Sequence, residues 1–198
     1  MEQAQAHPLR YTVEQYLALE EKSEIRHEYF QGEIMAMAGT TTDHNELCLN
    51  CAIELRQAAM KRGCRLFMEN IQLAVNEGEL YTYPDVMLTC HDEDVVAPRI
   101  MHPLLLIEVL SPSTAEHDRV WKLFRYQRIT SLRHYVLVSQ QYQAVEWYHR
   151  VEERGEWQRH LLTLPHEAVE IPELNTRLTL TDIYAGLKIP FVTDDKIS

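Results

Sequence analysis

One acidic residue of this chain lies where a charge is energetically costly. The run over residues 104–110 is apolar except for Glu108 near its centre, and this pattern predicts a buried strand. An isolated ion in an apolar interior is so unfavourable that a buried carboxylate is normally protonated, paired with a cation or bound to a metal. A second acid, Asp85, lies at the beginning of another apolar run, which ends at Leu88. The two acids are therefore candidates for one shared site.

Two carboxylates on strands and a nearby lysine are the residues that a magnesium-dependent hydrolase of phosphodiesters needs. Mg²⁺ prefers hard oxygen ligands and usually takes one or two carboxylates together with water and phosphate oxygens. Asp85 and Glu108 are 23 residues apart, which suits two neighbouring strands joined by a loop. The backbone carbonyl of Val109 can add another oxygen. The ion would activate water, and Lys122 would orient that water or offset charge on the phosphate.

Lys122 lies in a segment that is predicted to be helical. Asp118, Lys122 and Tyr126 follow one another at intervals of four residues. Arg119 lies three residues before Lys122. Side chains three and four residues apart are neighbours on a helix, so all four can share one face.

Each of these candidates also has a purely structural interpretation. Glu108 can form a buried ion pair with an arginine. Pro84-Asp85 is a common pair of turn residues. Asp118 and Lys122 can form a surface ion pair, which would be worth only ~0.3–0.5 kcal/mol.

The elements that must position these residues alternate between helix and strand, which predicts a mixed α/β domain. Thr12 and Gln15 form a capping box that begins a helix. Further helices are expected over residues 44–62, 115–129 and 181–187. A strand or hairpin is expected over 29–37, with Gly32 as a bend or bulge. Further strands are expected over 65–75, 80–88, 104–110 and 134–139, with a hairpin made of 144–151 and 157–164. The most apolar strand, 104–110, is expected at the centre of the sheet.

The composition is that of one globular domain, which we place over residues 1–198 with a core of about residues 11–187. The net charge of −11 disfavours broad binding to nucleic acid, because such binding depends on basic residues that neutralise phosphates. Basic residues do cluster once, either on a solvated helix face or toward a substrate. These residues are Arg119, Lys122, Arg125, Arg128 and Arg133.

The sequence shows neither a membrane-spanning segment nor a signal peptide, and this predicts the compartment and the redox state of the cysteines. No apolar stretch approaches the ~20 residues of a membrane-spanning helix, and residues 1–10 do not have the pattern of a signal peptide. We therefore expect a cytoplasmic location, no membrane partner and reduced thiols. Cys48 and Cys51 have the spacing of a metal pair and can share a helix face with His44. No second pair completes such a site, so buried thiols are the favoured interpretation.

Taken in order, these motifs resemble a large bacterial family of restriction-endonuclease-like proteins within the PD-(D/E)XK nuclease superfamily. The resemblance extends from about residue 11 to residue 187. The segments that carry it are Tyr83-Pro84-Asp85-Val86, residues 107–114, Asp118-Arg119 with Lys122 and Tyr126, residues 26–34 and residues 39–45.

The resemblance implies a restriction-endonuclease-like fold, in which helices flank a central mixed sheet with the acids at one edge. The hairpin near the C-terminus would be an addition to this core. Asp85 matches the aspartate of the PD motif and Glu108 matches the second acid. The superfamily usually places a lysine two residues after that acid, where this chain has Leu110. The resemblance implies that Lys122, on the following helix, takes the role of this lysine.

The resemblance also adds residues around the two acids. Glu28 matches an upstream glutamate and would be a third acidic ligand; its structural alternative is a carboxylate that makes an ordinary hydrogen bond. His44, Arg119 and Tyr126 would lie close enough to contact the substrate. For His44, the alternative is an ordinary histidine in the first turn of a helix.

Three functions remain open at this point. The first is a Mg²⁺- or Mn²⁺-dependent endonuclease or nickase that acts on DNA as a homodimer, by analogy with relatives that cut duplexes. The second is a nuclease-like module that binds nucleic acid or protein without cutting, which the displaced lysine and the acidic composition would explain. The third is a metal-dependent hydrolase of another phosphate ester.

Overall fold

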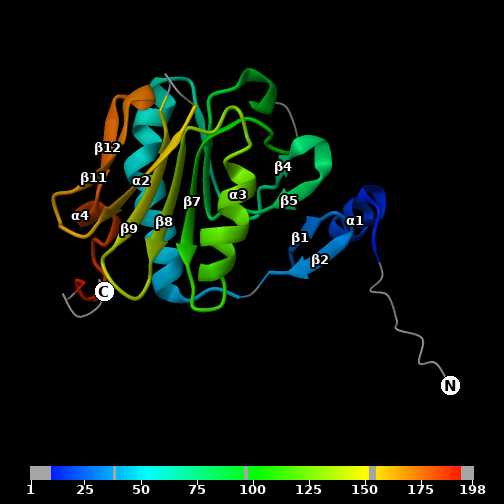
Figure 1. Cartoon of the computed structure of the whole chain (residues 1–198), viewed down its shortest axis with the longest axis horizontal. Helices are drawn as coiled ribbons and strands as arrows, with labels where there is room; N and C mark the ends of the chain where they lie inside the picture. Colours follow the sequence, from blue (N-terminus) through cyan, green and yellow to red (C-terminus); the bar gives the residue numbers. More distant parts are fainter. Residues whose placement is uncertain (1–9, 38, 96–97, 152–154, 193–198) are drawn as a thin grey trace.

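The computed structural model describes residues 10–37, 39–95, 98–151 and 155–192. Its largest sheet has six strands: β3 (Arg65–Met68), β6 (Val86–Thr89), β7 (Pro103–Leu110), β8 (His134–Ser139), β9 (Val145–Arg150) and β10 (Trp157–Leu162). Their spatial order is β10-β9-β8-β7-β6-β3 (Figure 1). β7 and β8 are parallel, and the other neighbouring pairs are antiparallel. The sheet is therefore mixed, and β7 lies inside it as its apolar sequence predicts.

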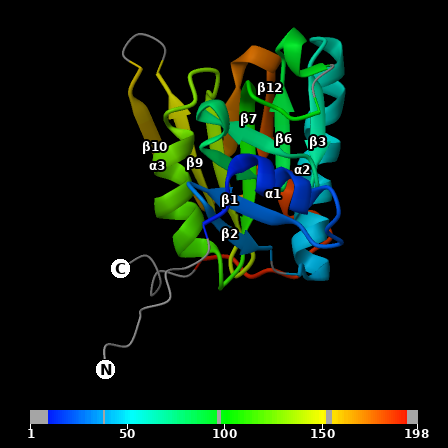
Figure 2. The same ribbon diagram turned by 90° about the vertical axis from the view of Figure 1, so that its right-hand side faces the viewer.

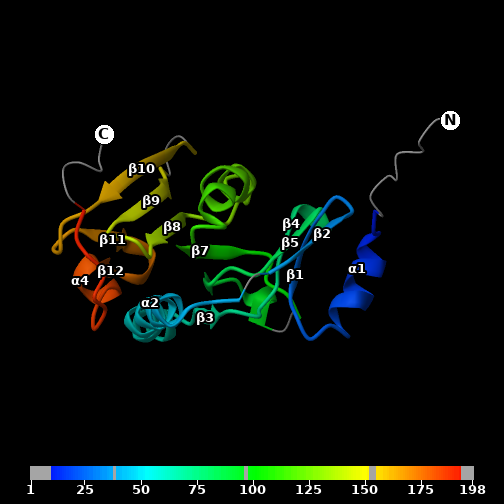
Figure 3. The same cartoon turned by 90° about the horizontal axis from the view of Figure 1, so that it is seen from below.

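Helices cover both faces of this sheet. α2 (Thr42–Lys61) lies against one face, and the helix that ends in α3 (Leu123–Tyr126) lies against the other (Figure 3). Side chains alternate along β7, so Ile107 and Val109 pack with the α2 side of the core. Leu106 and Leu110 pack with the α3 side. Glu108 lies between these two leucines in the alternation and therefore faces α3.

A second, smaller sheet lies beside the first. It contains β1 (His27–Phe30), β2 (Glu33–Ala36), β4 (Leu73–Val75) and β5 (Leu80–Thr82) in the order β2-β1-β5-β4. Figure 2 shows α1 (Val13–Glu20) and the β1–β2 hairpin in front of the large sheet. Tyrosine rings from α1, β1 and β5 pack against one another and join helix and sheet. This unit carries Glu28 on β1 toward the large sheet.

The last elements form a hairpin of β11 (Ala168–Ile171) and β12 (Thr176–Thr179), followed by α4 (Leu180–Ile183). Their apolar side chains complete the core on the α2 side. The short helix is the one expected near residue 181, and the β11–β12 hairpin was not expected. Each of its strands has only four residues, which is too short for a clear alternating pattern.

The predicted fold class is confirmed, including the antiparallel pair β9–β10 near the C-terminus. Part of the turn expected between these strands, residues 153–154, lies outside the described residues. The described helices include none that is both long and apolar enough to cross a membrane.

Two expected strands are each divided between the two sheets. The segment 65–75 forms β3 and β4, and the chain turns between them at Glu69 and Asn70, which both have positive φ. The segment 80–88 forms β5 and β6, and Tyr83-Pro84-Asp85 separates them. Proline cannot donate to a strand ladder, which explains the break. As a result, Asp85 lies where the chain crosses from the small sheet to the large one.

The expectation that all thiols are reduced is wrong for one pair. Cys64 and Cys90 form a disulfide with a Cα–Cα distance of 4.2 Å. Arg65 pairs with Thr89 in the antiparallel β3–β6 ladder, so the next residues outward, Cys64 and Cys90, lie opposite each other. Cys48 and Cys51 are free and buried, as expected.

Candidate active site

Asp85 and Glu108 meet across two antiparallel strands. Val86 of β6 pairs with Ile107 of β7. Asp85 comes one residue before Val86 and Glu108 one residue after Ile107, so the two acids occupy opposing positions at the same edge of the sheet. The backbone N–H of Val109 donates a hydrogen bond of 2.6 Å to Asp85 Oδ2. This bond holds the Asp85 carboxylate against β7, beside Glu108.

A buried lysine joins acids from three different elements. Lys122 Nζ lies 3.1 Å from Glu108 Oε1 on β7 and 2.9 Å from Glu28 Oε1 on β1. It also lies 3.2 Å from Asp118 Oδ1, four residues earlier on its own helix. Only 6% of Lys122 and 3% of Glu108 are exposed. The interpretation of Asp118–Lys122 as a surface pair is therefore wrong, and the cation that pairs with Glu108 is this lysine.

The helix that carries Lys122 is not a regular α-helix. Residues His117–Lys122 are π-helical, and α3 follows directly. The Tyr135 hydroxyl on β8 donates a hydrogen bond of 3.1 Å to the Asp118 carbonyl oxygen and ties this segment to the sheet. π-helical turns occur frequently at functional sites. Here the π-helical turn brings Asp118 and Lys122 together over Glu108.

Tyr126 supports Glu108 from one turn further along the helix. Its hydroxyl donates a hydrogen bond of 3.3 Å to Glu108 Oε1 and is 2.8 Å from Thr82 Oγ1. The Tyr126 ring is fully buried. The expectation that Tyr126 contacts the substrate is corrected, because this side chain has no accessible surface and instead orients the Glu108 carboxylate.

The charges in this cluster are unbalanced. Burial raises the pKa of Glu108 well above its usual value; Lys122 opposes this shift, and the nearby acids Asp118, Asp85 and Glu28 add to it. Burial disfavours the Lys122 ammonium, but the surrounding carboxylates hold its pKa well above the ordinary lysine value. Burial also opposes ionisation of Glu28, yet Lys122 and His117 lower the pKa of this acid overall. Lys122 therefore stays charged, and the site favours an additional positive charge near Glu108.

His44 lies beside Asp85. Its Nε2 is 3.3 Å from Asp85 Oδ2, and its Nδ1 is 3.5 Å from Cys48 Sγ. Burial disfavours the imidazolium form, but Asp85 raises the pKa of His44 overall. His44, Cys48 and Asp85 offer ligand atoms that all lie within 4.8 Å of one another. The candidate ligand group on this helix therefore contains His44 and Cys48 together with Asp85 from outside the helix, and it does not contain Cys51.

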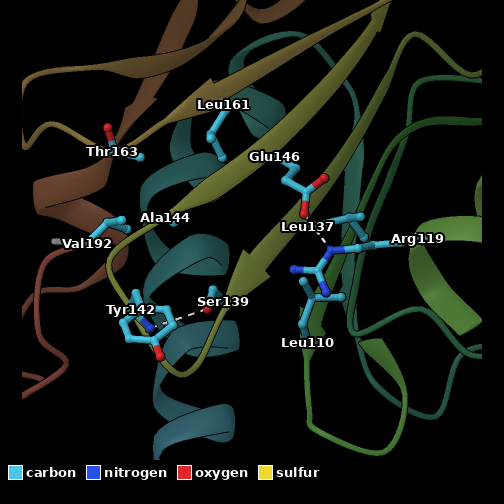
Figure 4. Close-up of a pocket in the computed structure, with 10 residues that line it drawn as sticks. All are labelled: Leu110, Arg119, Leu137, Ser139, Tyr142, Ala144, Glu146, Leu161, Thr163 and Val192. Carbon is cyan, nitrogen blue, oxygen red and sulfur yellow. Dashed lines mark hydrogen bonds and ion pairs between the residues drawn. The ribbon is translucent and has the colours of Figure 1, made fainter. Parts of the chain in front are cut away.

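Arg119 points away from the acidic cluster. It shares the π-helical segment with Lys122, but its Nε lies 2.5 Å from Glu146 Oε1 on β9. Figure 4 shows this pair at one wall of a pocket next to the cluster. The expectation that Arg119 shares one face with Lys122 and Tyr126 is therefore wrong, because the wider π-turn directs it toward β9. Its side chain is 42% exposed, so a substrate contact at this position stays a prediction.

Two residues of the cluster were missed by sequence reasoning. His117 Nε2 lies 3.7 Å from Glu28 Oε2, and Thr82 meets Tyr126 as described above. His117 stacks on Trp121 with ring centroids 4.4 Å apart, which fixes its position. The position of His117 next to the Asp118-Arg119 motif was the one available signal, and nothing near Thr82 indicated its role.

The donor set suits a hard divalent cation. Asp85 and Glu108 lie at opposing positions on neighbouring strands, and Mg²⁺ and Mn²⁺ prefer carboxylate oxygens as ligands. Within the described part of the chain, Glu28 Oε1 and Asp118 Oδ1 are buried and have no hydrogen-bond partner, although both lie within ion-pair distance of Lys122. Buried carboxylate oxygens without hydrogen bonds are costly, and a bound cation would reduce that cost.

The central mixed sheet and the helices on both of its faces define a restriction-endonuclease-like domain. The chain belongs to the Uma2 family, which is described as "Putative restriction endonuclease" and matches residues 13–182.

Two curated relatives are similar to most of this chain, and both are described only as uncharacterized proteins. The chain is 31% identical to an uncharacterized protein of Synechocystis sp. over 178 residues, which cover 88% of this chain and 91% of the relative. A second uncharacterized Synechocystis protein is 34% identical over 146 residues, which cover 72% of this chain and 82% of the relative.

A solved structure supports the fold. The crystal structure of a "putative nuclease belonging to DUF820" from Anabaena variabilis superposes with a TM-score of 0.72 at 18% identity. The match covers 88% of this chain and 98% of that chain. At this identity the likeness establishes the architecture, and the chemistry must be argued from the residues.

Proposed function

We propose that this protein is a Mg²⁺- or Mn²⁺-dependent endonuclease that hydrolyses phosphodiester bonds of DNA. The observation that carries the proposal is the convergence of Glu28 and Glu108 on the buried Lys122, with Asp85 held next to Glu108 by the Val109 N–H. Glu28, Glu108 and Asp118 share one lysine, and Asp85 adds a fourth carboxylate beside Glu108. The negative charges outnumber this cation, which favours binding of a divalent cation. The family description and the nuclease-like fold point to the same chemistry.

Asp85 and Glu108 would hold the metal ion together with the backbone carbonyl of Val109, and Glu28 would assist them. The ion would supply Lewis acidity to the phosphate and to water. The chain's own residues then have defined tasks. Lys122 is too firmly protonated to accept a proton, so it donates a hydrogen bond to the attacking water or offsets negative charge that develops on the phosphate. Tyr126 keeps the Glu108 carboxylate in position.

His44 and Arg119 would contact the substrate on either side of the acids. His44 lies on the Asp85 side at the beginning of α2, and Arg119 lies on the β9 side. The proposal places the protein in the cytoplasm and pairs two copies, because cleavage of both strands of a duplex needs two sites. Sedimentation equilibrium would then give twice the 23.3 kDa of one chain.

The deciding experiment is cleavage of supercoiled plasmid in Mg²⁺ or Mn²⁺. We expect the wild type to nick or linearise the plasmid, EDTA to stop it, and Asp85→Ala and Glu108→Ala each to slow it at least about 100-fold. Arg177→Gln removes an exposed charge on β12 and serves as a matched control with wild-type activity. Equal behaviour of the wild type and both alanine variants would remove the two acids from catalysis.

A non-catalytic module is the second candidate, and the position of Lys122 favours it. The lysine is already bound to three carboxylates, and Leu110 occupies the place where the superfamily usually has its lysine. Calorimetric titration with Mn²⁺ separates the two candidates. Binding that disappears in the Asp85→Ala/Glu108→Ala double variant supports the nuclease, and absence of binding to the wild type supports the module. A panel of chromogenic phosphodiesters tests the third candidate, a hydrolase of another phosphate ester.

A further inference from the structure

A pocket of about 280 Å³ opens beside the acidic cluster, at the same edge of the large sheet (Figure 4). Its floor is apolar and is formed by Leu110, Leu137 and Leu161. Hydroxyl groups of Ser139 and Thr163 lie among its lining residues. Its volume is just below the ~300 Å³ at which ordinary ligand pockets begin, so it suits a single ring system.

The sheet register places this pocket on the same face as Glu108. Glu108 pairs with Leu137 of β8, and Leu137 pairs with Glu146 of β9. Side chains of paired residues point to the same face of a sheet. Two strand spacings separate Glu108 from Glu146, which corresponds to about 10 Å. A chain molecule held at the acidic cluster can therefore reach the pocket with its next unit.

Two arginines converge on Glu146, which lines this pocket together with Arg119. Arg119 Nε binds Glu146 Oε1 at 2.5 Å, and Arg159 Nη2 binds Glu146 Oε2 at 2.9 Å. The Glu146 side chain is only 10% exposed, whereas those of Arg119 and Arg159 are 42% and 53% exposed. Burial opposes ionisation of Glu146, but the two guanidinium groups outweigh burial and lower its pKa. The trio therefore carries one net positive charge.

Glu146 orients both guanidinium groups without using all their donors. Arg119 uses its Nε, and Arg159 uses Nε and one Nη. A guanidinium has five N–H donors in a planar fork, so each arginine keeps donors for another acceptor. Such forks match the oxygens of a phosphate. Both arginine side chains are largely exposed, so a phosphate can approach their remaining donors while Glu146 keeps its bonds to both.

We propose that this pocket binds one unpaired nucleotide of the substrate, next to the phosphodiester that is cut, with its phosphate on Arg119 and Arg159 and its base on the apolar floor. The proposal rests on the proposed nuclease function and adds a substrate class, single-stranded or locally unpaired nucleic acid. A base inside a duplex cannot enter a pocket unless it is unstacked and unpaired, which costs a few kcal/mol. Recognition through few phosphates also fits a chain with a net charge of −11.

The test is fluorescence anisotropy with a labelled 12-nucleotide single strand and with the same sequence as a blunt duplex, in Ca²⁺ as an oxygen-binding ion. We expect the single strand to bind the full-length protein at least about tenfold more tightly than the duplex. Arg159→Gln should weaken single-strand binding about five- to tenfold and reduce the salt slope by ~0.7, the value for one phosphate contact. Leu161→Glu, which places a charge on the floor, should weaken binding similarly.

Arg177→Gln carries the same change of charge on β12 and should bind like the wild type. Arg159 and Leu161 are exposed, so both variants should keep the wild-type melting temperature, which verifies that they fold. The proposal is overturned if the duplex binds as tightly as the single strand, if neither oligonucleotide binds, or if Arg159→Gln and Leu161→Glu bind like the wild type.

Failure of the pocket and failure of the nuclease are distinguishable. Plasmid cleavage that depends on Asp85, together with equal binding of both oligonucleotides, overturns the pocket alone. Single-strand binding that depends on Arg159, without any cleavage in Mg²⁺ or Mn²⁺, supports the pocket and overturns the nuclease.

Discussion

Lys122 Nζ lies 3.1 Å from Glu108 Oε1, and neither side chain is more than 7% exposed. Glu28 and Asp118 approach the same ammonium from β1 and from the helix itself. One buried cation thus connects the small sheet, the large sheet and the π-helical segment. Both the stability of the fold and the proposed reaction depend on the Lys122 ammonium. Loss of this lysine would leave three buried carboxylates without a positively charged partner.

Lys122→Met should therefore destabilise the metal-free protein strongly. We expect the free energy of unfolding to fall by about 3–5 kcal/mol, the usual cost of removing one partner from a buried ion pair. Urea denaturation in EDTA measures it. Arg119→Gln is the control, because its partly exposed pair should cost no more than ~1 kcal/mol. Equal stability of Lys122→Met and the wild type would contradict the role of Lys122 as the balancing charge.

The raised pKa of Glu108 makes the stability of the metal-free protein depend on pH. The folded state holds the Glu108 proton more tightly than the unfolded state, where the pKa is about 4.3. Its stabilising contribution is complete below that value and is lost as pH rises through the folded pKa. Glu28 acts in the opposite sense, because its lowered pKa contributes stability above about pH 4.3 that is lost on acidification.

Glu108→Gln should accordingly be more stable than the wild type at pH 8 in EDTA, and the difference should shrink toward pH 5. Mg²⁺ should stabilise the wild type more at pH 8 than at pH 5 and leave Glu108→Gln nearly unaffected. Thermal or urea unfolding across this pH range, with and without Mg²⁺, measures both effects. An identical pH slope in the wild type and the variant would show that Glu108 does not titrate with folding.

Tyr126→Phe tests the support of Glu108 from α3. Removing the hydroxyl leaves Thr82 Oγ1 buried without this partner and frees Glu108 to rotate. We expect a loss of about 1–3 kcal/mol in stability and a weaker Mn²⁺ affinity in calorimetry, by less than tenfold. Tyr16→Phe removes a buried hydroxyl in α1 and should cost stability with unchanged Mn²⁺ affinity. If the two variants bind Mn²⁺ equally, Tyr126 has no role in positioning the ligand.

The four cysteines should divide into two chemically different pairs. Cys48 and Cys51 are buried, and burial raises the pKa of Cys51 to about 12, so neither should react with a thiol reagent in the native protein. Denaturation without reductant should release two reactive thiols, because Cys64 and Cys90 are bonded. Cys64→Ser/Cys90→Ser should lower the free energy of unfolding by about 2–4 kcal/mol under non-reducing conditions and by much less in dithiothreitol. Four reactive thiols in the denatured protein would contradict the disulfide.

Several features of the fold follow from local patterns. The apolar run around Glu108 predicted an inner strand, and β7 is one. The capping box at Thr12 and Gln15 predicted the beginning of α1, where both hydrogen bonds are present. The prediction of one strand over 80–88 was wrong, because Pro84 divides this segment between two sheets. A continuous apolar run does not show which sheet each half joins.

The sequence alone determined which residues had to be explained: a carboxylate inside an aliphatic strand, an acid after Pro84 and a lysine on the following helix. Burial and helical spacing are local properties, so they can be read along the chain. Only the tertiary structure decided that Glu28 reaches the same lysine, that Arg119 turns to Glu146 and that Cys64 meets Cys90. Those contacts depend on sheet order, strand register and one π-helical turn, which arise when distant segments pack together and leave no periodic signal in the sequence.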